Sequence, residues 1–254
     1  MKNKNICWVL SGTDAIEFDL DITNKKNTKL LCVGNAPDLK DAVSPAISCI
    51  GSVIMTRMNQ PGKSKSIFLV DELPTVNFQN LEVFTSTARK HNVSTILALQ
   101  DFSQAERDLG KDSARILRTT CSNQNYGQTG KYETAREVQD MLGEIEKVSD
   151  SYTTQDSGSR SETESMKKEK VILARDIMGQ PTGHYVGKII NGKPPYYSAQ
   201  LDLDAGYSEE IPAFSLIVDT GDAEKDAEVM DKIVEANYQR IMNDAKELLK
   251  PYQE

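Results

Sequence analysis

The sequence predicts an α/β fold with a mostly parallel sheet flanked by helices. Two apolar runs predict the strands of this sheet, IFLV at 67–70 and VSTILAL at 93–99. Near-continuous apolar runs are typical of parallel strands that are covered on both faces. A helix candidate at 80–90 lies between them. Strands that alternate with helices favour parallel pairing and a doubly wound sheet.

Polar side chains follow both runs. Asp71 and Glu72 end the first run, and Gln100 ends the second. Because open α/β sheets bind ligands at the carboxyl ends of their strands, we expect the three side chains to share one edge. A nucleoside-triphosphate site needs one carboxylate near Mg²⁺ and often a second group that activates water. The alternative for each residue is an ordinary polar strand end.

Two further features bear on this nucleotide hypothesis. Arg89, 17 residues after Glu72, stands at the end of the intervening helix candidate, where it could reach a neighbouring subunit or simply favour the helix C-terminus. The tripeptide Gly62-Lys63-Ser64 resembles part of a phosphate-binding loop. It has Arg57 where that loop needs glycine, and it follows a helix and opens a strand, which is the reverse of the required order. We interpret it as a connector.

The remainder of the first 148 residues alternates in the same way. A short strand-like run follows residue 5, and LLCV at 30–33 predicts a buried strand. Ser103 and Glu106 form a capping box that predicts a helix to about Leu117. The other expected elements are a helix within 37–58, a strand at 119–126, and a helix at 132–142 closed by Gly143.

Two more regions follow. Residues 149–166, rich in Ser, Thr, Gly and acids, are expected to be a flexible loop. Residues 167–254 are expected to hold a β-hairpin and a long helix. The hairpin has strands at 183–190 and 196–203 with an Asn191-Gly192 turn, and the amphipathic helix runs over 223–249 with Asp222 as its cap.

Composition excludes several classes. The net charge of −8 argues against a broad basic DNA-wrapping face. Four widely spaced cysteines and two histidines give no metal-ligand spacing, so reduced thiols in a cytoplasmic protein are expected. No apolar stretch reaches the roughly 20 residues of a membrane helix, so direct membrane insertion by this chain is not expected.

The stretch IFLVDELPTVNFQNLEVFTSTARKHNVSTILALQDFSQAERDLG resembles the core of TraG/TraD-type conjugative coupling proteins. These are the DNA-pumping ATPases of conjugation, mobilisation and type IV secretion. The shared pattern is a strand ending in Asp-Glu, a helix ending in a basic pair, and a strand ending in Gln before a Ser-Gln helix. The flank VILARDIMGQPTGHYVGKIINGKPPYYSAQL resembles the segment after the motor core. The opening of the chain resembles the segment before the Walker B strand, especially as seen in mobilisation proteins of Bacteroides-like bacteria. In all, the likeness spans roughly residues 8–203.

The resemblance implies a RecA-like P-loop NTPase fold, present here only in its C-terminal part, and a hexameric ring with ATP and Mg²⁺ at subunit interfaces. By position, Asp71 would hold Mg²⁺, Glu72 would polarise the hydrolytic water, Gln100 would sense the γ-phosphate, and Arg89 would act in trans. Residues 1–148 would be the Walker B half of the motor. Because the Walker A loop is missing, this chain is expected to hydrolyse ATP only within a full-length hexamer and to bind no nucleotide tightly by itself.

The implied partners are single-stranded DNA, the relaxase or relaxosome, and type IV secretion components. The full-length protein would be anchored at the bacterial inner membrane by a preceding segment. The alternative hypothesis is a non-enzymatic docking module, whose acidic C-terminal region binds relaxosome or secretion-system partners.

Overall fold

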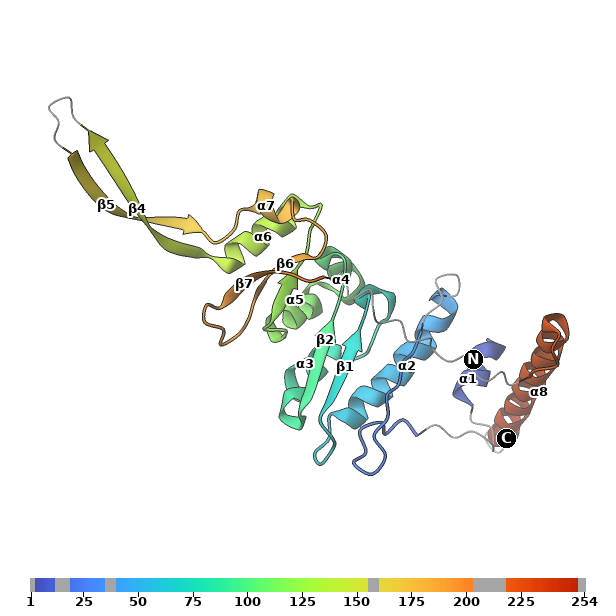
Figure 1. Ribbon diagram of the computed structural model, residues 1–254. Coiled ribbons are helices and arrows are strands. Elements are labelled where there is room, and N and C mark those ends of the chain that lie inside the picture. Colours follow the sequence, from blue (N-terminus) through green and yellow to red (C-terminus); the bar gives the residue numbers. More distant parts are fainter. Residues whose placement is uncertain (1–2, 12–18, 35–39, 155–159, 203–217, 251–254) are drawn as a thin grey trace. The chain divides into compact units, whose positions relative to one another are not determined.

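The computed structural model describes residues 3–11, 19–34, 40–154, 160–202 and 218–250, shown in Figure 1. The chain forms two compact units, one of Met1–Leu117 with Glu209–Glu254 and one of Arg118–Ser208. The C-terminal helix belongs to the first unit because it packs against the N-terminal one.

A parallel pair of strands organises the first unit. Ser66 of β1 lies opposite Val93 of β2, and Val70 lies opposite Leu97. The unit has the strands β1 (Ser66–Val70) and β2 (Val93–Leu97), the 3-10 turns η2 (Leu73–Thr75) and η3 (Ala88–His91), and the helices α1 (Lys4–Leu10), α2 (Lys40–Met58), α3 (Leu81–Thr87), α4 (Phe102–Leu109), α5 (Lys111–Thr120, which crosses into the second unit) and α8 (Ala223–Leu249).

One face of the β1–β2 pair carries the hydrophobic core. Phe68 makes edge-to-face contacts with Phe78 and with Phe84 of α3, at centroid distances of 5.7 and 5.3 Å. Buried side chains of α2, including Met55 and Met58, join the same cluster. The buried side chains of α2 and α3 therefore mark the helix faces that cover this side of the strands.

The other face of the pair is uncovered within the part of the chain that the structure describes. Ile67 and Leu69 of β1 are 65% and 61% exposed, and Ile96 of β2 is 46% exposed. Among the described residues, therefore, helices cover only the Phe68 side of these two strands. Three apolar side chains in solvent on neighbouring strands form a surface that is typical of an interface.

Three local expectations in this unit are wrong. The run after residue 5 is the helix α1, capped by the side chain of Asn3. Residues 30–33 form no strand, and Leu30 is 90% exposed. The helix expected from Ser103 to Leu117 is two helices, α4 and α5, because Gly110 between them has a φ of 84°. The cap of α4 is Asp101, whose carboxylate accepts from the Ser103 amide at 2.8 Å.

The helix α8 has the predicted bounds, and the Asp222 carboxylate caps it by accepting from the amides of Glu224 and Lys225. Its middle packs against α1, with Val234 and Asn237 buried. Lys4 of α1 lies 3.6 Å from Glu235. Figure 1 shows the two helices side by side.

The second unit is built on an antiparallel sheet in the order β3-β6-β7. Its elements are β3 (Gln124–Tyr126), α6 (Tyr132–Leu142), β4 (Glu144–Thr154), β5 (Arg160–Lys170), α7 (Ala174–Met178), β6 (His184–Lys188) and β7 (Tyr196–Gln200). The β6–β7 hairpin and the helix closed by Gly143 are as predicted. Asn191, in the segment between β6 and β7, has a φ of 64°. Val138 and Ile177 centre a small core.

The Ser-rich segment differs from its expectation. Residues 144–154 and 160–170 pair along their whole length as the antiparallel ribbon β4–β5, from Glu144 opposite Lys170 to Thr154 opposite Arg160. Residues 155–159 lie outside the described residues. The composition predicted a loop because it lacks apolar side chains, but backbone pairing in a ribbon does not need an apolar face to register two strands.

Candidate functional site

Glu72 and Gln100 meet at the carboxyl ends of β1 and β2. The Gln100 Nε2 donates to Glu72 Oε2 at 2.9 Å. The parallel register brings this about, since Val70 and Leu97 lie opposite each other and each strand ends a few residues before its polar side chain. The structure thus brings together an acid and an amide that are 28 residues apart.

Two backbone hydrogen bonds join the loops beyond the strands. The Ala98 amide donates to the Val70 carbonyl, and the Leu73 amide donates to the Ala98 carbonyl, both at 2.9 Å. Between these bonds the backbone turns sharply, with Glu72 at φ 57° and ψ 59°. A left-handed conformation is uncommon for a residue with a side chain and is often found at functional sites. No feature of the sequence indicated this conformation.

Asp71 lies between Val70 and this turn. Its side chain is exposed, and within the described residues it makes no hydrogen bond or ion pair. The Asp71 carboxylate is therefore free to ligate a cation through water, as carboxylates do for nucleotide-bound Mg²⁺. The described residues contain no cluster of three or more His, Cys, Asp or Glu side chains that could hold a metal by themselves.

Arg89 is not part of this edge. It is an exposed residue of η3, ahead of the first residue of β2. Because β2 runs from there towards Gln100, Arg89 lies at the opposite edge of the strand pair. The two edges are about 17 Å apart, since β2 has five residues and a strand rises roughly 3.3 Å per residue. Arg89 cannot serve the Glu72 of its own chain, which leaves a role in trans or its ordinary place at a helix end.

The Gly62-Lys63-Ser64 connector also lies at the opposite edge. Gly62 has a φ of 81° in the turn that joins α2 to β1. The Lys63 ammonium lies 2.6 Å from Asp21, and the Ser64 amide donates to the Thr23 carbonyl. These contacts hold a surface loop, so the interpretation of the tripeptide as a connector agrees with the structure.

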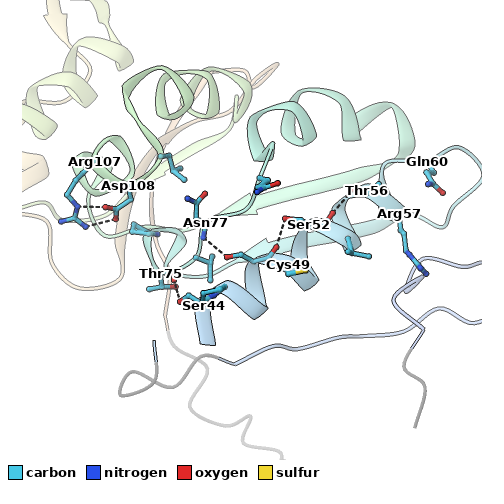
Figure 2. A pocket seen from close by; sticks show the side chains of 17 residues that line it. Ser44, Cys49, Ser52, Thr56, Arg57, Gln60, Thr75, Asn77, Arg107 and Asp108 are labelled. Atoms are coloured by element: carbon cyan, nitrogen blue, oxygen red, sulfur yellow. Dashed lines mark hydrogen bonds and ion pairs between the residues drawn. The ribbon is translucent and has the colours of Figure 1, made fainter. Parts of the chain in front are cut away.

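A shallow groove of about 1210 Å³ lies on the other side of the turn, between α2, residues 74–79 and the end of α4. Four hydroxyl side chains of α2 line it, Ser44, Ser48, Ser52 and Thr56. Figure 2 labels Ser44, Ser52 and Thr56. At one end Arg107 donates two hydrogen bonds to Asp108, at 2.6 and 2.8 Å. Asp71, Glu72 and Gln100 do not line the groove. Sequence reasoning missed the hydroxyl row, although its four-residue spacing was visible.

Comparison with known families identifies the region around this site. The family model described as the TraM recognition site of TraD and TraG matches residues 66–182, which include Asp71, Glu72, Arg89 and Gln100. The chain resembles the C-terminal part of a TraG/TraD-type coupling protein. The resemblance inferred from the motifs is thereby confirmed. No curated protein sequence matches the chain.

Solved structures of the bacterial conjugative coupling protein TrwB share the fold. An unbound monoclinic form is 22% identical and covers 65% of this chain and 39% of its own, with a TM-score of 0.56. A trigonal form with sulphate is 20% identical over 72% and 42%, with a TM-score of 0.59. A complex with ADP and Mg²⁺ is 21% identical over 70% and 40%, with a TM-score of 0.55.

These similarities confirm the predicted α/β, RecA-like fold class with its parallel strands, hairpin and long helix. The chain spans about two fifths of the length of the TrwB structures that it matches. Within the described ranges, no helix combines the length and the apolar character that crossing a membrane requires.

Proposed function

We propose that this chain supplies the Walker B half of an ATPase site in a conjugative coupling protein. The observation that carries the proposal is the 2.9 Å hydrogen bond between Gln100 and Glu72 at the carboxyl ends of two parallel strands. Support comes from the TraG/TraD match over these residues and from structures of TrwB in complex with ADP and Mg²⁺ and with a non-hydrolysable GTP analogue.

The residues fit a nucleotide only in part. The exposed Asp71 carboxylate suits a water-bridged Mg²⁺, which would neutralise charge on the transferred phosphoryl group when bound. Glu72 would accept the proton of the attacking water, and Gln100 would orient that water or the phosphate oxygen. The backbone cradle for phosphates is not among the described residues near these side chains. We therefore propose that ATP binds only when another segment completes the site.

In the proposed assembly the complete protein forms a hexameric ring anchored at the bacterial inner membrane, with this part in the cytoplasm. The ring moves single-stranded DNA with its relaxase towards a type IV secretion channel. Arg89 then completes the site of the next subunit. Its place at the edge opposite Glu72 supports this, because Arg89 is too far from the Glu72 of its own chain to act there.

The test uses the complete coupling protein that contains these residues. Glu72→Gln should keep ATP binding and slow hydrolysis by about 10²–10⁴-fold, because the amide cannot accept a proton. Glu106→Gln, at an exposed acid of α4, is the matched control and should hydrolyse ATP normally. Hydrolysis by Glu72→Gln at the wild-type rate would remove the proposal.

The trans assignment of Arg89 has its own test. Rings mixed from Glu72→Gln and Arg89→Ala subunits should regain part of the wild-type turnover, because some interfaces pair an intact Glu72 with an intact Arg89. If mixed rings form and ATP turnover does not recover, Arg89 does not act in trans and is only a cation at the end of its helix.

A second candidate function is a docking module without catalysis. The observation that favours it is the description of the matching family as a TraM recognition site, over residues 66–182. Titration calorimetry of this chain with a relaxosome protein, with and without residues 223–254, would test it. Loss of binding on that deletion supports the acidic C-terminal region as the docking element, and unchanged binding places the contact elsewhere.

A further inference from the structure

The turn after β1 is held by a series of hydroxyl groups. The Thr75 Oγ1 donates to the Glu72 carbonyl at 2.8 Å, and the Thr75 amide donates to the same oxygen at 2.9 Å. This oxygen belongs to the residue with the left-handed backbone whose carboxylate meets Gln100. The two donors therefore fix the peptide plane that follows Glu72.

Helix α2 holds the same segment from outside. The Ser44 Oγ donates to the Thr75 carbonyl at 2.9 Å, 31 residues away in sequence. One turn further along α2, the Ser48 Oγ accepts from the Asn77 amide at 3.2 Å. Figure 2 shows the contact between Ser44 and Thr75 at the wall of the groove. By contrast, the hydroxyls of Ser52 and Thr56 donate to carbonyls within α2, so these bonds do not connect the helix to the turn.

We infer that Thr75, supported by Ser44, is a positioning residue that sets the backbone of Glu72 so that its carboxylate faces Gln100. The inference rests on the proposed function, because the importance of this orientation comes from the role of Glu72. Neither hydroxyl touches the carboxylate. They act through the Glu72 carbonyl. The orientation of that peptide plane sets the direction of the Glu72 Cα–Cβ bond and so of the side chain.

The first test needs no catalysis and uses this chain. The Gln100 side-chain amide resonance should shift between the wild type and Glu72→Ala, since its Nε2 bonds that carboxylate. The same comparison, with and without Glu72→Ala, is then made in each threonine variant. Thr75→Val, which keeps the shape and removes the hydroxyl, should abolish this shift. Thr75→Ser should restore it. Thr85→Val is the matched control, because the Thr85 hydroxyl makes the same kind of bond to the carbonyl three residues earlier, on α3.

The second test measures hydrolysis in the complete protein. Thr75→Val should lower kcat by about 10- to 100-fold with KM for ATP unchanged, as misplacement of a reacting group does. Ser44→Ala should act in the same direction with a smaller loss. Ser52→Ala, on the same face of α2, should leave kcat as it is.

The outcomes separate this inference from the proposed function. If Thr75→Val keeps the Gln100 shift, or if Thr85→Val loses it equally, the positioning role is overturned. Equal loss of kcat in Thr75→Val and Thr75→Ser also overturns it, because the hydroxyl would not be the active group. If Glu72→Gln hydrolyses ATP normally, the proposed function fails, and the resonance test still decides the positioning of Glu72.

Discussion

Asn237 of α8 donates a hydrogen bond to the hydroxyl of Ser11 at 2.8 Å, across 226 residues of sequence. Asn237 is only 8% exposed, and its carbonyl oxygen accepts from Arg240 at 3.0 Å. Both polar ends of this buried amide are thus satisfied where α1 meets α8.

Replacing this amide should loosen the packing of the two terminal helices. Asn237→Ala should lower the free energy of unfolding by about 1–3 kcal/mol, because the hydroxyl of Ser11 and the Arg240 side chain lose their partner. Asn243→Ala, at an exposed position of the same helix, should stay within about 0.5 kcal/mol of wild type. Urea denaturation measures both, and equal losses would contradict the role of Asn237.

The uncovered face of the β1–β2 pair should make the chain self-associate. Leu69→Thr and Ile67→Thr should reduce light scattering and dye binding, since they remove the most exposed apolar side chains of that face. Val70→Thr puts the same residue type into the buried face, where Val70 is 7% exposed, and should instead destabilise the unit. Unchanged scattering in the double variant would show that this face is not the associating surface.

Gly187 lies at the centre of the β3-β6-β7 sheet without room for a side chain. A Cβ there would meet the carbonyl oxygen of Gln124 and, at 2.7 Å, the ring of Tyr197. Gly187→Ala should therefore cost about 1–3 kcal/mol of stability through overpacking. Gly130→Ala has open space around it and is the control in the same unit. Thermal unfolding of the two variants should separate them clearly.

Cys121 should react slowly with alkylating reagents. Burial raises the pKa of the Cys121 thiol, because the thiolate loses hydration. At a given pH it therefore holds less of the reactive form than an unshifted thiol. The exposed Cys49 of α2 should be labelled first. The labelling rate at Cys121 should keep rising to a higher pH than the rate of a cysteine in a short unstructured peptide. Mass spectrometry of timed digests measures both, and equal profiles would contradict the shift.

The sequence contained enough to predict the strands that carry the site and the elements with strong local signals. The runs before Asp71 and Gln100 predicted β1 and β2, and the stripe after Asp222 predicted α8 to the residue. These succeed because apolar periodicity and side-chain caps act within a few residues. That Glu72 and Gln100 meet followed from strand polarity alone.

What could not be predicted depends on distant partners. The run at 30–33 reads as a strand, but an apolar segment becomes one only if a neighbour pairs with it, and Leu30 has none in the described part of the chain. The capping box predicted at Ser103 does not form, because the carboxylate of Asp101 accepts from the Ser103 amide and caps the helix two residues earlier. The hydroxyl contacts from α2 to Thr75 span 31 residues and leave no local trace.

The left-handed backbone of Glu72 has a consequence for how this protein can vary. Such a conformation costs on the order of 1–3 kcal/mol in a residue with a β-carbon, and glycine or asparagine would adopt it more easily. Selection for stability alone should thus favour losing the glutamate, while the proposed activity requires keeping it. A variant of this chain selected for thermal stability is therefore expected to replace Glu72 and lose the proposed activity.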